Sequence, residues 1–175
     1  RHKSIKAAGV YHRLGIVISA EYHKEIGNHG GLPLIIQLHG AGERGNGGEE
    51  LAAVDVHGLS KLMHGASYPC RFVMPQCPRD TFWAARVESL VAFVEQLKAA
   101  FEVDEDRVYL TGLSMGGFGT WFVAMARPDL FAAIAPICGG GMYWNTARLK
   151  KMPIWAFHGE KDHVVLVEET KKLER

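Results

Sequence analysis

Ser114 stands in the stretch Gly112-Leu113-Ser114-Met115-Gly116, which has the form G-x-S-x-G. The stretch lies between a strand-like run over 107–111 and a predicted helix over 115–127. A turn this tight leaves no room for Cβ atoms beside the serine, which explains the glycines, and it exposes the serine Oγ. The free N–H groups and positive dipole end of the helix can stabilise a developing oxyanion. We therefore predict that Ser114 is a nucleophile; the alternative is a structural Gly-Ser turn.

A second glycine-rich bend, His39-Gly40-Ala41-Gly42, directly follows the apolar run 32–38. Such a bend at the end of a strand can turn a backbone N–H toward the serine. We therefore predict that the amides of Met115 and Ala41 form an oxyanion hole. His39 is read as a structural histidine that holds the loop, with the role of catalytic base as the alternative.

The same loop also contains G-x-G-x-x-G over residues 40–45, the pattern of a dinucleotide-binding turn. That function needs a helix that begins within the motif to receive the pyrophosphate, and an acidic residue about 20 positions further on. Asn46-Gly47-Gly48 follows instead and disfavours a helix. We therefore expect no dinucleotide cofactor. No H-E-x-x-H or similar spacing is present, so no metal site is predicted either.

The acidic partner of a serine–histidine pair is expected after the late strand-like run 153–157, where His158-Gly159-Glu160-Lys161-Asp162 follows. Asp162 fits the chain order nucleophile, acid, histidine. Glu160 is the weaker candidate, and a solvated turn carboxylate is the structural alternative. Trp83 and Trp144, the latter beside Tyr143, are candidates for the walls of a substrate pocket, although such aromatic residues are as often simple packing.

The elements that position these residues alternate between strands and helices. Apolar or β-branched runs predict strands over 13–19, 32–38, 72–75, 107–111, 131–137 and 153–157. An apolar stripe predicts a helix over 87–101, and further helices are expected over 115–127 and 168–175. This order predicts an α/β fold: a mostly parallel sheet with helices on both faces, whose functional residues lie at the carboxyl ends of the strands.

Composition limits the classes of function. The 175 residues suffice for about one domain, and 20 Lys+Arg against 19 Asp+Glu leave a net charge of +1. This balance argues against a general electrostatic role on nucleic acid or on anionic membranes. Without a long apolar run or a signal-peptide pattern, we expect a soluble protein, cytoplasmic or secreted, with no membrane span. Three cysteines cannot form a complete disulfide framework.

Together these stretches resemble the α/β-hydrolase superfamily. Residues 38–45, 75–78, 112–117 and 158–162 are similar to one subgroup, the bacterial esterases labelled predicted peptidase or phospholipase/carboxylesterase-like, which are related to feruloyl esterases and polyester depolymerases. The resemblance runs from about Leu32 to the end of the chain. It implies a serine carboxylic-ester hydrolase that acts on small or aryl esters, with Ser114 as nucleophile, Asp162 as acid and the 39–42 loop in the oxyanion hole.

The pattern of the superfamily also includes a histidine base beyond the acid, and here the chain departs from it. After Asp162 the only histidine is His163, whose side chain should point away from the face that Asp162 presents. We therefore expect residues 1–175 to be a single α/β-hydrolase domain without its last strand, histidine loop and helix, and with weak esterase activity as it stands. The alternatives are a related serine peptidase and a catalytically impaired binding domain.

Overall fold

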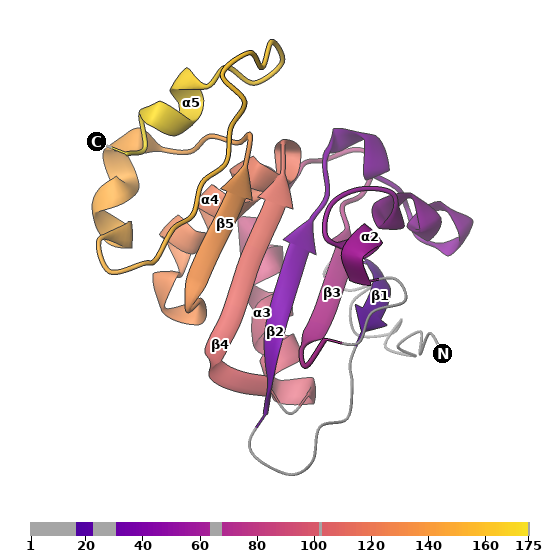
Figure 1. Cartoon of the computed structure of the whole chain (residues 1–175). Coiled ribbons are helices and arrows are strands. Elements are labelled where there is room, and N and C mark those ends of the chain that lie inside the picture. The colour runs from indigo at the N-terminus through magenta and orange to yellow at the C-terminus, as the bar shows by residue number, and fades with distance from the viewer. Residues whose placement is uncertain (1–16, 23–30, 64–67, 102, 175) are drawn as a thin grey trace.

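Five strands form one sheet in the computed structural model of the chain, which describes residues 17–22, 31–63, 68–101 and 103–174 (Figure 1). The strands are β1 (Val17–Tyr22), β2 (Leu32–Leu38), β3 (Arg71–Gln76), β4 (Val103–Leu113) and β5 (Ala133–Ile137). Their order across the sheet is β1-β3-β2-β4-β5, and only β1 runs antiparallel to its neighbour. The predicted mostly parallel sheet is confirmed. Residues 13–16 of the expected first strand lie outside the described residues.

The run over 153–157 continues the sheet beyond β5 without forming a full strand. Two parallel bridges join it to β5, Ile134 to Ile154 and Ile137 to Phe157. The N–H of Trp155 donates to Ile134 O at 3.1 Å. This segment therefore delivers the 158–162 turn to the same edge of the sheet at which β5 ends.

Helices cover both faces of the sheet, as predicted, but unequally. The α-helices are α2 (Ser60–Met63), α3 (Val87–Ala100), α4 (Met115–Ala126) and α5 (Glu168–Lys171), and the 3₁₀ helices are η2 (Ala41–Glu43), η3 (Gly48–Asp55), η4 (Trp83–Ala85), η5 (Pro128–Leu130) and η6 (Tyr143–Leu149). In Figure 1, α3 and α4 lie behind the sheet and α2 lies in front of it near β3. The helix expected over 168–175 ends at Lys171. No helix among the described residues is long and apolar enough to cross a membrane.

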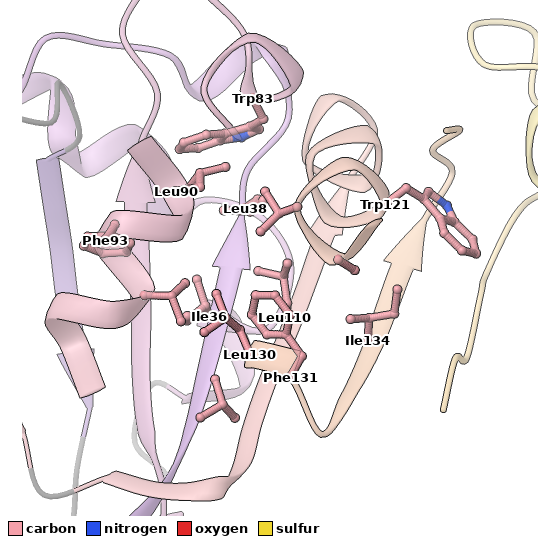
Figure 2. Close-up of a cluster of buried hydrophobic side chains, with 14 of the residues drawn as sticks. Ile36, Leu38, Trp83, Leu90, Phe93, Leu110, Trp121, Leu130, Phe131 and Ile134 are labelled. Carbon is pink, nitrogen blue, oxygen red and sulfur yellow. The ribbon is translucent and has the colours of Figure 1, made fainter. Parts of the chain in front are cut away.

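Alternating side chains of β2 divide the core between the two faces. Leu34, Ile36 and Leu38 point to the α3/α4 face and pack in the larger cluster, whereas Ile35 points to the opposite face. Figure 2 shows the larger cluster, in which Trp83, Leu90 and Phe93 meet the sheet residues. The smaller cluster comprises Val54, Cys70, Phe72 and Met74, under η3. The cysteines at positions 70, 77 and 138 are all free thiols.

The front face of β4 and β5 carries an apolar groove of about 670 Å³. Its lining includes Tyr109, Ala135 and Ile137 from the strands and Trp155 from the bridging segment. Trp155 is 72% exposed. The helices described on this face thus cover mainly the β3 side, in keeping with the packing of η3 against β1 and β3.

Replacing Phe93 with alanine should destabilise the fold more than any surface change. Phe93 is fully buried between α3 and the sheet, so its removal leaves a cavity that close-packed neighbours fill only in part. We expect the free energy of unfolding to fall by about 3–5 kcal/mol in urea titrations. Trp144→Ala, at a tryptophan that is 71% exposed, is the matched control and should stay within ~0.5 kcal/mol. Equal losses in the two variants would contradict this packing.

Candidate active site

Ser114 occupies the sharp turn between β4 and α4 in a conformation that non-glycine residues rarely adopt. Its φ is 56° and its ψ is −113°. The Ser114 N–H donates to Ile137 O at 2.9 Å, and Ser114 O accepts from the Phe118 N–H at 3.0 Å. A non-glycine residue in a sparsely populated backbone region costs of order 1–3 kcal/mol and persists only where its surroundings hold it in place. Both ends of the Ser114 backbone are therefore fixed.

The two glycines that flank Ser114 are required by close backbone packing. A Cβ on Gly112 would overlap the carbonyl of Gly116, and a Cβ on Gly116 would overlap the carbonyl of Leu38. The first turn of α4 therefore sits directly against the ends of β4 and β2. This contact places the nucleophile candidate beside the loop that follows β2.

The 39–42 loop passes next to Ser114 because β2 and β4 end at the same level. Leu38 pairs with Gly112 in the parallel register, and a Cβ built on Gly40 would lie 4.0 Å from Ser114 Cβ. Met115 is the first residue of α4 and Ala41 the first of η2, so neither N–H has an acceptor within its own helix. The two amides predicted as oxyanion donors thus belong to the two segments that meet at Ser114.

His39 is a buried component of this loop. Its Nε2 accepts the N–H of Cys77 at 2.9 Å, so its Nδ1 carries the proton and donates to Gly40 O at 2.6 Å. Burial lowers the pKa of His39, which keeps the imidazole neutral. With both nitrogens occupied, His39 has the structural role favoured by the sequence and is not free to accept a proton from Ser114.

Gln76, at the end of β3, holds the following part of the loop. Its side chain is fully buried, and its Nε2 donates to the carbonyls of Glu43 (3.0 Å) and Glu50 (2.8 Å). Its Oε1 accepts the Gly47 N–H at 3.0 Å. One amide side chain therefore satisfies three backbone groups of the 43–50 segment, which has no sheet partner of its own.

Gln76→Leu should loosen this loop at nearly constant side-chain volume. The change leaves buried backbone groups unpaired, at about 1–3 kcal/mol for each such group. We expect a lower denaturation midpoint and faster hydrogen exchange at the Gly47 amide. Gln96→Leu on α3 is the control, because the buried Gln96 Oε1 has no hydrogen-bond partner within the described residues. A Gln76 variant as stable as the Gln96 variant would refute the bracing role.

Asp162 lies in the turn after the bridging segment, as an ordered carboxylate. Its Oδ1 accepts the N–H groups of Val164 (2.9 Å) and Val165 (3.0 Å). Hydrogen bonds from Val165 and Val164 lower the pKa of Asp162, so the group is ionised at neutral pH. Oδ1 thus fixes the carboxyl group, and Oδ2 remains available to a second partner, with His158 Nε2 3.7 Å away.

Cys138 directly follows β5, whose last residue, Ile137, accepts the Ser114 N–H. Burial is the main effect that raises the pKa of its thiol; the nearby Asp162 charge raises it further, and a hydrogen bond from the Ser114 backbone opposes both. The Cys138 N–H donates to Phe157 O at 2.7 Å, and its φ is 39°. Cys138 therefore joins the end of β5 to the segment that leads into the Asp162 turn, and the structure brings Ser114 and Asp162 to one edge of the sheet.

The described histidines other than His39 do not complete a serine–histidine pair. The His158 side chain is 3% exposed, with Nδ1 2.7 Å from Thr170 Oγ1 and Nε2 2.7 Å from Val165 O. His57 Nδ1 contacts Glu43 Oε1 at 2.7 Å, and His163 is exposed. No hydrogen bond joins any of these rings to Ser114 within the described residues. Histidines 2, 12, 23, 29 and 64 lie outside those residues.

A cavity of about 460 Å³ opens beside Ser114. Its lining is Phe82, Ala84, Ser114, Met115, Phe118 and Phe122. Phe118 and Phe122 follow Ser114 at helical spacings of four and eight residues, and this spacing is a sequence signal that places them on the same side of α4 as Ser114. The three phenylalanines give the cavity an aromatic wall.

Neither tryptophan expected at the pocket lines this cavity. Trp83 is fully buried, and its Nε1–H donates to His39 O at 3.0 Å. The centroids of the Trp83 and His39 rings are 5.1 Å apart. Its neighbour Phe82 is the residue that faces the cavity. Trp144 is exposed on η6 and packs edge-on against Tyr143, with ring centroids 5.1 Å apart. Trp83 therefore supports the loop from behind, and another tryptophan, Trp121, packs in the core.

The described residues contain neither a cluster of possible metal ligands nor an α-helix that begins in the G-x-G-x-x-G stretch. Across the described part of the chain, no three His, Cys, Asp or Glu side chains converge as metal ligands. The G-x-G-x-x-G stretch contains only the three-residue 3₁₀ helix η2, and a second 3₁₀ helix, η3, begins after it. An α-helix that could receive a pyrophosphate does not begin in this motif.

Comparisons with known proteins agree with this geometry. The profile of the prolyl oligopeptidase family matches residues 84–147, which include α3, β4, Ser114 and α4. Poly(3-hydroxyalkanoate) depolymerase C of Paucimonas lemoignei is 34% identical over 133 residues, 67% of this chain and 30% of that protein. A bifunctional acetylxylan esterase/xylanase of Neocallimastix patriciarum is 31% identical over 90 residues, 51% of this chain and 12% of that protein.

The crystal structure of a thermostable esterase superposes with a TM-score of 0.75 and 35% identity, over 90% of this chain and 46% of that one. The chain thus spans less than half of each of these relatives. The superposition nevertheless includes nearly the whole of the present chain. The chain belongs to the α/β-hydrolase superfamily and is similar to esterases within it.

Proposed function

We propose that this protein is a serine carboxylic-ester hydrolase that works through an acyl-enzyme on small or aryl esters. The observation that carries the proposal is the backbone of Ser114, with its positive φ at the start of α4. A solvent-facing Gly-Ser turn has no need of this strained geometry, whereas a nucleophile presented above a sheet does. The similarity to esterases and to a depolymerase supports the same chemistry.

In the proposed reaction, Ser114 Oγ attacks the ester carbonyl carbon. The amides of Met115 and Ala41 donate to the oxygen that becomes negative in the tetrahedral intermediate. Collapse of the intermediate breaks the bond to the alcohol oxygen, and the alcohol leaves with the proton lost by Ser114, carried by a base. Water then adds to the acyl-enzyme and releases the acid and free Ser114.

Asp162 is proposed as the carboxylate that orients the histidine base and stabilises its imidazolium form. Its lowered pKa and its double anchoring through Oδ1 suit this role. Since His39 and His158 have both ring nitrogens occupied, neither is proposed as that base.

The aromatic cavity supports the substrate class. Its volume of about 460 Å³ lies within the ~300–1,000 Å³ of small-molecule sites, and Phe82, Phe118 and Phe122 favour flat apolar groups. We propose that an aryl or short alkyl part of the ester occupies it while the carbonyl lies at Ser114.

Hydrolysis of p-nitrophenyl acetate and p-nitrophenyl benzoate tests the proposal directly. Turnover of either ester that depends on Ser114 is the expected result. Absence of turnover and of any acylated serine would contradict it and favour a binding domain. The prolyl oligopeptidase match makes a serine peptidase the second candidate; faster cleavage of aminoacyl p-nitroanilides than of the esters would establish that alternative.

A further inference from the structure

Arg44 connects two segments of the candidate active site through backbone carbonyl groups. Its Nε donates to Ala41 O at 3.0 Å. Its Nη1 donates to Thr81 O at 3.2 Å and to Arg79 O at 3.4 Å. Arg44 has no carboxylate partner among the described residues, so its guanidinium is held by hydrogen bonds to backbone carbonyl groups rather than by an ion pair.

Each of the two segments contributes a different part of the site. Ala41 carries one of the proposed oxyanion donors, and Thr81 directly precedes Phe82, which lines the cavity. A second link, from Trp83 Nε1 to His39 O, joins the same segments on their buried side. Arg44 therefore joins the two segments on their partly exposed side, and Trp83 joins them within the core.

The guanidinium group is suited to this task in a way that an ammonium group is not. Its donors are fixed in one plane, so contacts in two directions orient both carbonyl groups at once. Ala41 begins the one-turn helix η2, and its carbonyl lies in the peptide plane that it shares with the Gly42 N–H. Fixing this plane on the C-terminal side of the Ala41 Cα limits how far the Ala41 N–H, on the other side, can move. Small displacements of such a donor matter, because its stabilisation acts on the transition state.

We propose that Arg44 is a positioning residue that ties the substrate-cavity wall at Phe82 to the oxyanion donor at Ala41. This inference rests on the proposed esterase function, which supplies the role of Ala41. Its consequence is that Arg44 sets the rate of acyl transfer more than the binding of the ester.

The test compares Arg44→Met and Arg44→Lys with a control that loses the same kind of contact elsewhere. Arg148 donates to the carbonyls of Met125 and Ala126 at the far end of α4, about 18 Å along the helix from Ser114. Arg148→Met therefore removes a guanidinium–carbonyl clamp without touching the candidate site. Steady-state kinetics with p-nitrophenyl acetate and hydrogen exchange of residues 40–45 and 79–83 are measured for all four proteins.

For Arg44→Met we expect kcat to fall about 10- to 100-fold with little change in KM, and both segments to exchange faster. Arg44→Lys should remain close to the methionine variant, and Arg148→Met should retain the wild-type kcat. Full activity of the lysine variant would overturn the proposal, since charge alone would then suffice. An effect confined to KM, or equal losses in the Arg148 variant, would also overturn it.

Hydrogen exchange separates this inference from the proposed function. If the wild-type protein turned over no ester, the proposed function would fail, yet faster exchange in both segments of Arg44→Met would still establish the clamp. If esters were hydrolysed and exchange in both segments were unchanged in Arg44→Met, the clamp would fail while the proposed function stood.

Discussion

In a form of the protein that also supplies the histidine base, Ser114→Ala is expected to lower kcat for p-nitrophenyl acetate by at least about 10³-fold, because it removes the only atom proposed to form the acyl-enzyme. The fold should not change, since the backbone bonds of Ser114 to Ile137 and Phe118 do not involve its side chain. Initial-rate measurements on the purified variant, with circular dichroism to verify folding, provide the comparison.

Ser89→Ala is a suitable control, because Ser89 lies on α3 and is distant in sequence from both proposed oxyanion donors, Ala41 and Met115. It should match the wild-type protein in kcat and in stability. Retention of activity in Ser114→Ala, or a comparable loss in Ser89→Ala, would be incompatible with Ser114 as the nucleophile.

In a form of the protein that also supplies the histidine base, Asp162→Asn is expected to reduce kcat by roughly 10³- to 10⁴-fold, the second largest effect. The asparagine Oδ1 can still accept the Val164 and Val165 N–H groups, so the turn should keep its shape while the negative charge is lost. The loss then reports the charge that stabilises an imidazolium ion rather than a collapsed loop.

Glu160→Gln discriminates between the two carboxylates of the same turn. Glu160 is exposed, and we expect its replacement to leave kcat within about twofold of wild type, as surface changes usually do. A large loss at Glu160 with near-normal activity in Asp162→Asn would transfer the role of the acid to Glu160.

The pH dependence of stability offers a second readout of Asp162. The folded-state pKa of Asp162 is lowered, so its contribution is fully present above the unfolded-state value of ~3.9 and is lost as the pH falls through the lowered pKa. Thermal unfolding of the wild type and of Asp162→Asn should therefore differ at neutral pH and converge in strong acid. A constant difference at every pH would argue against the lowered pKa.

Much of the fold could be predicted because its strands and helices are locally distinctive. The run 32–38 is apolar except for Gln37, as expected for a strand largely buried on both faces, and the 87–100 helix has a regular apolar stripe. The sequence predicts a strand over 153–157, but these residues make only two bridges to β5. Periodicity measures the burial of side chains and cannot reveal how many backbone partners a segment finds.

The candidate site was predictable only where a motif prescribes backbone geometry. Ser114 could be found because its turn excludes side chains at Gly112 and Gly116. The cavity wall was not, since Trp83 and Phe82 are adjacent in sequence and either could have faced Ser114. The hydrogen bond from Trp83 to His39 holds the Trp83 side chain in the core, so that Phe82 faces the cavity. Such a long-range contact has no local sequence signal.

The residues that support the loop after β2, Gln76 and Arg44, could not be predicted from the sequence either. Gln76 and Arg44 donate to backbone carbonyl groups of residues that are distant along the chain. Because every residue has a backbone carbonyl, the type of the accepting residue gives no sequence signal for such a contact. Only the folded arrangement shows that the 75–78 and 39–45 stretches, which share a resemblance to the same esterases, are parts of one hydrogen-bonded unit.

The most direct test of the account is covalent labelling with a fluorophosphonate, followed by mass spectrometry of the labelled peptide. An activated serine loses its proton and attacks phosphorus, with loss of fluoride, whereas ordinary serines do not react at comparable rates. We expect one adduct per chain, located on Ser114, and no adduct in Ser114→Ala or in the denatured protein. An unlabelled wild-type protein, or an adduct on another serine, would contradict it.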